Sequence, residues 1–254
     1  MVRIFLLIPN LILSNDYFSF KQFTICQDRC AMKVGTDGTL LGVWARGGVR
    51  ILDVGTGTGL IALMMAQRFP QAMVDAIDID SNACQQACEN VVSSPFADRI
   101  AVHHCRLQDF MPDTHETKSD DTGSSLFTLH YDAVVANPPY FEQSLKAPDV
   151  QRSMARHTDS LSYRDLMNGV ARLLDYDGEF SVVIPFDCRS SLETEAIMAG
   201  LYPSRVCAVK TTPRKFARRY LLAFRKHPVE IETSELLMNS DAYRDLVKDF
   251  YLKG

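Results

Sequence analysis

The sequence of 254 residues lacks an excess of positive charge. Its 27 Lys and Arg residues stand against 31 Asp and Glu, which gives a net charge of −4. A protein coated with positive charge is thereby excluded, so any contact with nucleic acid must come from a local patch. The composition of a disordered chain is also absent, because 46% of the residues are hydrophobic. This apolar surface is sufficient for one sizeable core.

A hydrophobic segment long enough to span a bilayer is also absent, since a span needs roughly 20 apolar residues. The apolar stretch at residues 1–13 is shorter, and no small-residue cleavage site of a signal peptide follows it. We interpret this stretch as the result of a start codon assigned too far upstream, with the protein beginning near Ser14. We expect an N-terminal extension at residues 1–19 and a single domain at residues 20–254.

Cysteine pairs with the spacing of zinc ribbons or redox motifs are missing as well. The sequence has seven cysteines, and the pairs Cys26/Cys30 and Cys84/Cys88 are separated by three residues instead of two. We therefore expect no metal site. Reduced thiols that act as small hydrophobic side chains in a cytoplasmic protein explain this usage.

Short apolar runs alternate with helical patterns from residue 49 onward, which is typical of a parallel α/β sheet. The polar residues 112–125 contain scarcely an apolar side chain, and we interpret them as an exposed insertion. A turn is expected at residues 175–178. Strands are expected at 49–54, 73–79, 100–104, 131–136, 179–184, 204–211 and 220–225, and helices at 60–68, 82–93, 162–174, 189–198 and 234–251.

A glycine-rich segment joins the first expected strand to the first expected helix, and it reads Asp53-Val54-Gly55-Thr56-Gly57-Thr58-Gly59. Glycines permit a tight turn and let the backbone approach a ligand, while the helix N-terminus offers N–H groups to a negative group. Asp78, after the next strand, can accept hydrogen bonds from ribose hydroxyls. Asp80 is expected to cap a helix. Besides a turn without a ligand, two cofactors fit this pattern: a nicotinamide dinucleotide and S-adenosylmethionine.

The glycine spacing separates these two cofactors. Nicotinamide sites prefer G-x-G-x-x-G, whereas this segment has G-x-G-x-G led by Asp53, which resembles the first motif of class I methyltransferases. That resemblance implies a Rossmann-like class I methyltransferase fold, with a seven-stranded mostly parallel sheet and helices on both faces. It also implies roles in binding S-adenosylmethionine: the glycine loop would hold the amino-acid end, Asp78 the ribose, and Asp109 would lie near the adenine amino group.

A second motif, Asn137-Pro138-Pro139-Tyr140, follows the fourth expected strand at the edge where α/β sheets bind ligands. An exocyclic amine on an aromatic base is a poor nucleophile because its lone pair is delocalised into the ring. Two acceptors, the Asn137 side-chain oxygen and the Pro138 carbonyl, can draw charge onto that nitrogen. The prolines fix the backbone and Tyr140 offers a stacking face. The motif predicts N-methylation through positioning and electrostatics, without a strong general base.

Further segments of the sequence carry a more specific pattern. They are Phe20-Lys21-Gln22-Phe23, Met32-Lys33-Val34-Gly35-Thr36-Asp37-Gly38-Thr39-Leu40-Leu41-Gly42, Asn137-Pro138-Pro139-Tyr140-Phe141, and Ala155-Arg156-His157 with Leu161. These segments resemble the bacterial tRNA1(Val) (adenine(37)-N6)-methyltransferase family. The resemblance extends from Phe20 to Arg225, and it implies methylation of adenine N6 at position 37 in the anticodon loop. The insertion at residues 112–125 and the apolar leader depart from the family pattern.

A basic cluster gives modest independent support for a tRNA partner. Its five cations fall within a stretch of ten residues in the loop that joins the last two expected strands, and Phe216 lies among them. Such a cluster can neutralise several phosphates. A solvated hairpin tip is the alternative interpretation. The cluster consists of Lys210, Arg214, Lys215, Arg218 and Arg219.

Alternative functions remain open from the sequence alone. The same Asn-Pro-Pro-Tyr motif occurs in methyltransferases that modify a glutamine side chain of protein release factors, and a non-catalytic RNA-binding protein could retain the fold. A nicotinamide-dependent oxidoreductase is disfavoured by the glycine spacing. The roles of Lys33, Thr36 and Asp37 are also open, and Thr36 or Asp37 is expected either to cap the next helix or to contact the cofactor. We expect a monomer with no membrane partner.

Overall fold

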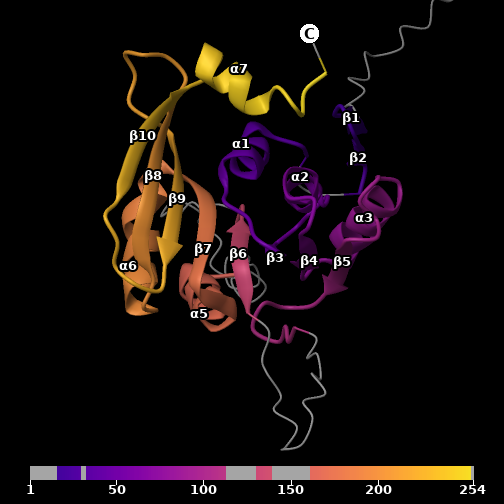
Figure 1. Cartoon of the computed structure of the whole chain (residues 1–254), viewed down its shortest axis with the longest axis horizontal. Coiled ribbons are helices and arrows are strands. Elements are labelled where there is room, and N and C mark those ends of the chain that lie inside the picture. The colour runs from indigo at the N-terminus through magenta and orange to yellow at the C-terminus, as the bar shows by residue number, and fades with distance from the viewer. Residues whose placement is uncertain (1–15, 30–32, 113–129, 139–160, 253–254) are drawn as a thin grey trace, which may run out of the picture.

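The computed structural model describes residues 16–29, 33–112, 130–138 and 161–252, which form an α/β structure around a central sheet (Figure 1). The strands are β1 Tyr17–Ser19, β2 Thr24–Cys26, β3 Arg50–Val54, β4 Met73–Asp78, β5 Ile100–His104, β6 Tyr131–Ala136, β7 Leu174–Pro185, β8 Tyr202–Lys210, β9 Arg219–Arg225 and β10 Glu232–Leu237. The helices are α1 Thr36–Trp44, α2 Leu60–Arg68, α3 Ser81–Val92, α5 Tyr163–Leu173, the 3-10 turn η1 Phe186–Cys188, α6 Arg189–Met198 and α7 Asp241–Val247.

The central sheet has eight strands in the order β10-β8-β9-β7-β6-β3-β4-β5. Its neighbours are parallel except where β9 pairs antiparallel with β7 and β8. The prediction of a mostly parallel sheet is confirmed, but the predicted count of seven strands is wrong. The additional strand is β10, which pairs with β8 at the edge of the sheet.

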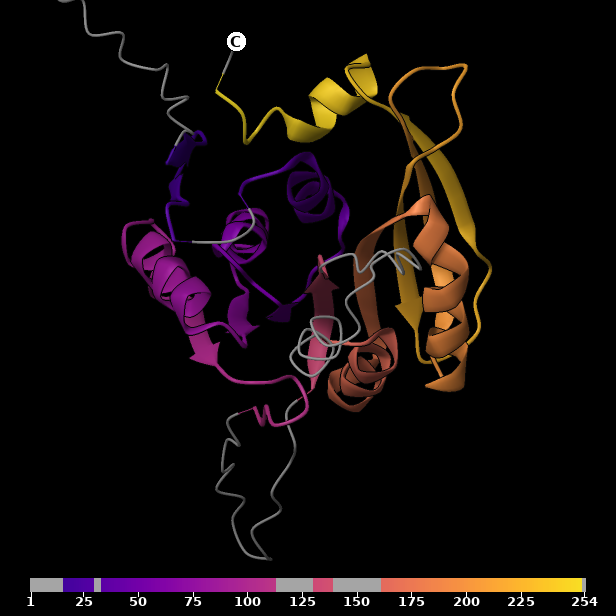
Figure 2. The same cartoon turned by 180° about the vertical axis from the view of Figure 1, so that it is seen from behind.

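Helices cover both faces of the sheet, as predicted (Figures 1 and 2). Side chains of β6 alternate between two apolar clusters: Ala133 and Val135 pack in one, Val134 and Ala136 in the other. The first cluster includes buried residues of α1, α2 and α7, and the second includes those of α5 and α6. Because both faces are covered, the central strands are largely apolar, which allowed their positions to be predicted from the sequence.

The C-terminal region differs most from expectation. A single helix was predicted at residues 234–251, but the chain forms β10 and then the shorter helix α7. The first four residues of β10 are exposed, so this strand has no apolar pattern to distinguish it from a polar helix. Polar and charged side chains are common on edge strands because they discourage pairing with other chains.

The turn predicted at residues 175–178 lies within β7, which begins earlier than expected. The register between β6 and β7 shifts there, since Tyr131 pairs with Leu174 whereas Ala133 pairs with Glu179. The backbone N–H of Asp177 also donates to the side chain of Asp175 at 3.2 Å. The turn-forming residues thus produce an irregularity within the strand instead of a separate connection.

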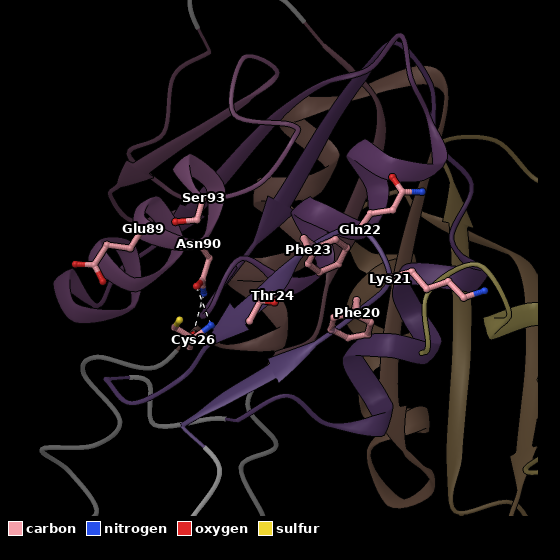
Figure 3. Close-up of a pocket in the computed structure, with 9 residues that line it drawn as sticks. All are labelled: Phe20, Lys21, Gln22, Phe23, Thr24, Cys26, Glu89, Asn90 and Ser93. Carbon is pink, nitrogen blue, oxygen red and sulfur yellow. Dashed lines mark hydrogen bonds between the residues drawn. The ribbon is translucent and has the colours of Figure 1, made fainter. Parts of the chain in front are cut away.

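The strands β1 and β2 pair antiparallel, and β2 lies against α3 (Figure 3). The buried side chain of Asn90 accepts a hydrogen bond from the Cys26 N–H at 2.8 Å and donates to the Cys26 carbonyl at 2.9 Å. A hollow of about 500 Å³ lies beside this contact, lined in part by Phe23 and Glu89. Strand β1 falls within the segment that we assigned to an N-terminal extension, and residues 1–15 lie outside the described residues.

No helix in the described part of the chain is long and apolar enough to cross a membrane.

Candidate active site

The order of the strands places a switch point between β3 and β6. From β3 the chain proceeds outward through β4 and β5, and it then returns to β6 on the other side of β3. In open α/β sheets, ligands bind outside the carboxyl ends of the strands at such a point. Val54 and Ala136 are register partners at the ends of β3 and β6. The glycine loop and Asn137, which follow these two residues, therefore begin side by side.

The glycine loop has the backbone conformation that its composition predicts. Gly55, Gly57 and Gly59 have φ values of 70°, 55° and 82°, in the region that disfavours residues with a side chain. A Cβ atom on Gly55 or Gly57 would meet nothing within 4 Å. The loop thus leaves open space at its surface, and the N-terminus of α2 follows directly after it.

Asp53, in β3, holds the glycine loop and the start of α2 through hydrogen bonds. Its carboxylate is fully buried, and Oδ2 accepts hydrogen bonds from the Thr56 hydroxyl at 2.7 Å and the Ala62 N–H at 3.1 Å. The other oxygen, Oδ1, has no hydrogen-bond partner among the described residues. Burial raises the pKa of Asp53 to about 7, against the stabilising effect of these two hydrogen bonds on the charged form.

We expect the stability of the protein to depend on pH through Asp53. Because its pKa in the folded protein is raised, the folded state binds this proton more tightly than the unfolded chain does. Its contribution to stability is complete below about pH 4 and is lost as the pH rises to about 7, on the order of 4 kcal/mol in total. Urea unfolding of the wild type and of Asp53→Asn, measured between about pH 4.5 and 8, tests this.

Asparagine at position 53 keeps the acceptor oxygen for Thr56 and Ala62 but cannot ionise. The difference between the unfolding free energies of the two proteins should therefore shift in favour of the variant as the pH rises. Parallel pH profiles would show that Asp53 does not titrate in this range.

Asp78 is brought to the glycine loop, as the sequence predicts. Its Oδ2 accepts a hydrogen bond from the Gly57 N–H at 2.9 Å, and its Oδ1 accepts one from the Asp80 N–H at 3.0 Å. A carboxylate has about four acceptor positions, so capacity for ribose hydroxyls remains. Asp80 caps α3 by accepting a hydrogen bond from the Asn82 N–H at 2.8 Å, which confirms its predicted structural role.

The role predicted for Asp109 is a contact with the adenine of the cofactor. Asp109 is exposed in the turn after β5 and lines a hollow of about 520 Å³. Other residues of this hollow, such as Arg50 and Met73, lie at the beginnings of β3 and β4. The hollow also includes Cys105, just after β5, whose N–H donates to the Asp78 carbonyl at 3.0 Å. The contact of Asp109 with the adenine of the cofactor stays a prediction.

Asn137 and Pro138 follow β6 directly, where Asn137 is half-buried and Pro138 is buried. A Cβ atom on Gly38 would come within 3.8 Å of the Asn137 Nδ2 atom and within 3.2 Å of Leu60. The first turn of α1 therefore lies beside Asn137, and the contact that favours glycine here is the tighter one with Leu60. Pro139 and Tyr140 lie outside the described residues.

The basic cluster is divided between ion pairs and an exposed loop. Lys210 pairs with Glu235 at 2.7 Å, and Arg219 pairs with Asp37 at 2.8 Å. The other members, Arg214, Lys215 and Arg218, are exposed in the connection between β8 and β9.

The contact with Arg219 identifies a role for Asp37 that the sequence left open. Asp37 lies in the first turn of α1, whose N-cap residue Gly35 makes no side-chain capping bond, and its carboxylate accepts a hydrogen bond from the Arg219 Nε. It thereby joins α1 to β9. Because the two residues are 182 positions apart, no local pattern could have shown this.

Asn90 is a further residue that the sequence analysis missed. Besides its contacts with Cys26, its side-chain nitrogen donates to the Thr58 carbonyl at 2.9 Å. One buried amide thus joins α3, β2 and the glycine loop. Its polar side chain in an otherwise helical pattern was the available signal, because a buried amide must find partners.

Comparisons with known proteins show the family of this chain. The family described as methyltransferase small domain matches residues 40–202. The tRNA1(Val) (adenine(37)-N6)-methyltransferase of Parabacteroides distasonis is 47% identical over 250 residues, covering 95% of this chain and 100% of that protein. The protein of the same name from Phocaeicola vulgatus is 48% identical over 246 residues, covering 94% and 98%. The chain belongs to the tRNA1(Val) (adenine(37)-N6)-methyltransferase family.

Likeness within this family extends to more distant bacteria and, in the fold alone, to other methyltransferases. The relative from Trichodesmium erythraeum is 40% identical over 251 residues, covering 95% of this chain and 100% of that protein. The solved structure of a predicted O-methyltransferase from Agrobacterium tumefaciens has a TM-score of 0.62 at 17% identity and covers 84% of this chain and 96% of its own. The fold is the Rossmann-like class I methyltransferase fold.

S-adenosylmethionine is the cofactor of this methyltransferase family. The residues present fit it: the open space at Gly55 and Gly57 can take the ligand, and Asp78 can accept hydrogen bonds from ribose hydroxyls. The unpartnered Oδ1 of Asp53 adds an acceptor beneath the loop.

Proposed function

We propose that this protein transfers the methyl group of S-adenosylmethionine to N6 of adenine 37 in tRNA1(Val). The observation that carries the proposal is the register of β3 and β6, which sets the glycine loop and Asn137 side by side at the switch point. A methyl donor on the loop would therefore lie next to a base bound at Asn137. The substrate follows from the names of relatives that this chain covers nearly completely.

Each residue after β6 has a chemical part in this reaction. The Asn137 side-chain oxygen and the Pro138 carbonyl accept hydrogen bonds from the two N–H groups of the target amine, which favours a lone pair on nitrogen. S-adenosylmethionine, when bound, would supply a methyl group on a sulfonium, and the neutral thioether S-adenosylhomocysteine would be the leaving group. The target nitrogen would take the methyl group and release a proton to water. Pro139 and Tyr140 are assigned from the sequence to fix the backbone and to stack on the base.

A direct test uses S-adenosylmethionine labelled in its methyl group and total tRNA from cells that lack this gene. Digestion to nucleosides should place the label in N6-methyladenosine, and sequencing of the labelled tRNA should place it at position 37 of tRNA1(Val). A parallel reaction with a release factor tests transfer to glutamine. Label in the release factor and none in tRNA would overturn the proposal.

We expect Gly57→Ala to weaken binding of S-adenosylmethionine. The new methyl group would occupy the open space beside the loop, and the positive φ of 55° would strain the backbone by about 1–2 kcal/mol. Isothermal titration should show an affinity at least about tenfold lower, because about 1.4 kcal/mol of lost contact corresponds to that factor.

Gly200→Ala is the matched control. Gly200 has a φ of 78° and equally open space around its Cβ position, but it lies in the turn between α6 and β8. The control should lose similar stability and bind the cofactor like the wild type. Equal losses of affinity in both variants would mean that backbone strain alone explains the effect.

A further inference from the structure

Two aromatic side chains are exposed near the proposed catalytic site. Phe216, in the connection between β8 and β9, is 95% exposed, and Phe186, at the start of η1, is 57% exposed. Aromatic side chains usually contribute large apolar areas to the core, as Phe180 and Phe224 do here. Large apolar side chains that are exposed on neighbouring segments can form a surface that binds a partner.

Phe186 contacts the end of the connection between β8 and β9. Its N–H donates to the Arg218 carbonyl at 3.1 Å, two residues after Phe216 in the sequence. Its ring centroid is 6.2 Å from that of Tyr220, and the Arg189 guanidinium lies 4.8 Å from the Tyr220 centroid. An aromatic ring and a guanidinium group therefore both lie near the Tyr220 ring.

This surface belongs to the catalytic edge of the sheet. Arg219 is the register partner of Pro185, at the carboxyl end of β7, beside β6. The ion pair with Asp37 joins Arg219 to α1, and the next residue of that helix, Gly38, packs close to Asn137. In Figures 1 and 2 the connection between β8 and β9 extends beyond the same edge toward which β6 points.

The charges indicate the chemistry of the partner. Arg214, Lys215 and Arg218 surround Phe216 in the sequence and are exposed with it. Cations interleaved with aromatic side chains suit single-stranded nucleic acid, whose phosphates pair with the cations while its bases stack on the rings. An apolar protein segment would gain nothing from these three cations. The bases of an anticodon loop are unpaired and can therefore be stacked in this manner.

We propose that Phe186 and Phe216 stack on unpaired bases of the RNA next to the target adenine, while Arg214, Lys215 and Arg218 contact phosphates. This inference rests on the proposed function. It assigns the aromatic residues to the affinity and placement of RNA, separately from methyl transfer at Asn137.

The test is fluorescence anisotropy with a labelled anticodon stem-loop of tRNA1(Val) and the full chain. Phe216→Ala should bind roughly tenfold more weakly, as expected for the loss of one base stack, and Phe216→Tyr should restore binding to within about twofold of the wild type. Met198→Ala is the control, because Met198 is 80% exposed at the end of α6, where the chain turns back to the beginning of β8. It should bind like the wild type.

The salt dependence separates stacking from charge. Phe216→Ala should leave the slope of log Kd against log salt concentration unchanged, whereas Arg214→Ala should reduce it by about one. Binding by Phe216→Ala equal to the wild type, or by Phe216→Tyr as weak as by the alanine variant, would overturn the inference. If the wild type methylates no tRNA, the proposed function fails; if it does and Phe216→Ala binds normally, only the stacking role fails.

Discussion

Asn137→Ala is expected to lower kcat for tRNA methylation by at least about 100-fold to 1,000-fold, while the affinity for S-adenosylmethionine stays within about twofold. A factor of this size is typical for removal of one group that stabilises developing charge in a transition state. The amine gains positive charge as the methyl group arrives, so the acceptor at Asn137 is needed most at that moment. The residues proposed to bind the cofactor lie in β3, in the loop after it and at the end of β4, and they are left unchanged.

Two further variants make this result specific. Asn137→Asp keeps an acceptor oxygen at the same position, so it should retain part of the activity that the alanine variant loses. Asn168→Ala removes an exposed asparagine from α5 and should be fully active. Single-turnover rates with bound tRNA would measure the chemical step directly. Normal rates with Asn137→Ala would exclude the mechanism, and a parallel loss of cofactor affinity would indicate a structural role for Asn137.

Several elements of the fold could be predicted because their apolar residues follow the spacing of a strand or a helix. Four predicted elements, the helices at 60–68 and 189–198 and the strands at 100–104 and 131–136, have the bounds found in the structure. Apolar periodicity determines such elements locally, and loops between parallel strands return to the same edge. The proximity of the two motifs after β3 and β6 could therefore be inferred before the fold was known.

Other parts of the structure depend on contacts that no local pattern encodes. β10 is a polar strand held by its pairing with β8, and its sequence alone fits a helix equally well. The contact between Asp37 and Arg219 joins residues from opposite ends of the chain. Arg219 appeared in the sequence as one of five similar cations, and only the fold separates it from the exposed Arg214.

The second prediction with a large expected effect concerns protein stability and a buried acidic residue, which lies away from the carboxyl ends of the strands. Glu179, which is 3% exposed, lies near the beginning of the regular part of β7 and receives hydrogen bonds to Oε1 from the Arg205 Nε at 3.1 Å and Nη2 at 2.6 Å. Arg46 and Arg225 approach its Oε2 at 3.4 Å and 3.5 Å. Arg205 is itself nearly buried and lies over the Trp44 ring, 3.8 Å from the centroid.

Glu179→Ala is therefore expected to lower the free energy of unfolding by about 3–5 kcal/mol, because it leaves buried positive charge without its partner. For a chain of this size that corresponds to a fall in Tm on the order of 10 °C. Glu232→Ala removes an exposed carboxylate that pairs with Arg46 at 3.0 Å, and should cost less than about 1 kcal/mol. Urea unfolding of both variants measures the difference.

The position of Glu179 also determines what should remain unchanged. Glu179 pairs with Ala133 in β6, and Ala133 lies three residues before Ala136 at the end of that strand. Glu179 is therefore separated along the sheet from the two motifs, which follow Val54 and Ala136. Folded Glu179→Ala protein should therefore methylate tRNA with a kcat close to that of the wild type below its Tm. Glu179→Gln, which keeps the size of the side chain, should be less destabilised because one oxygen can still accept from Arg205. Equal stabilities of Glu179→Ala and Glu232→Ala would mean that the arginines find other partners or water, and that their charges do not depend on this carboxylate.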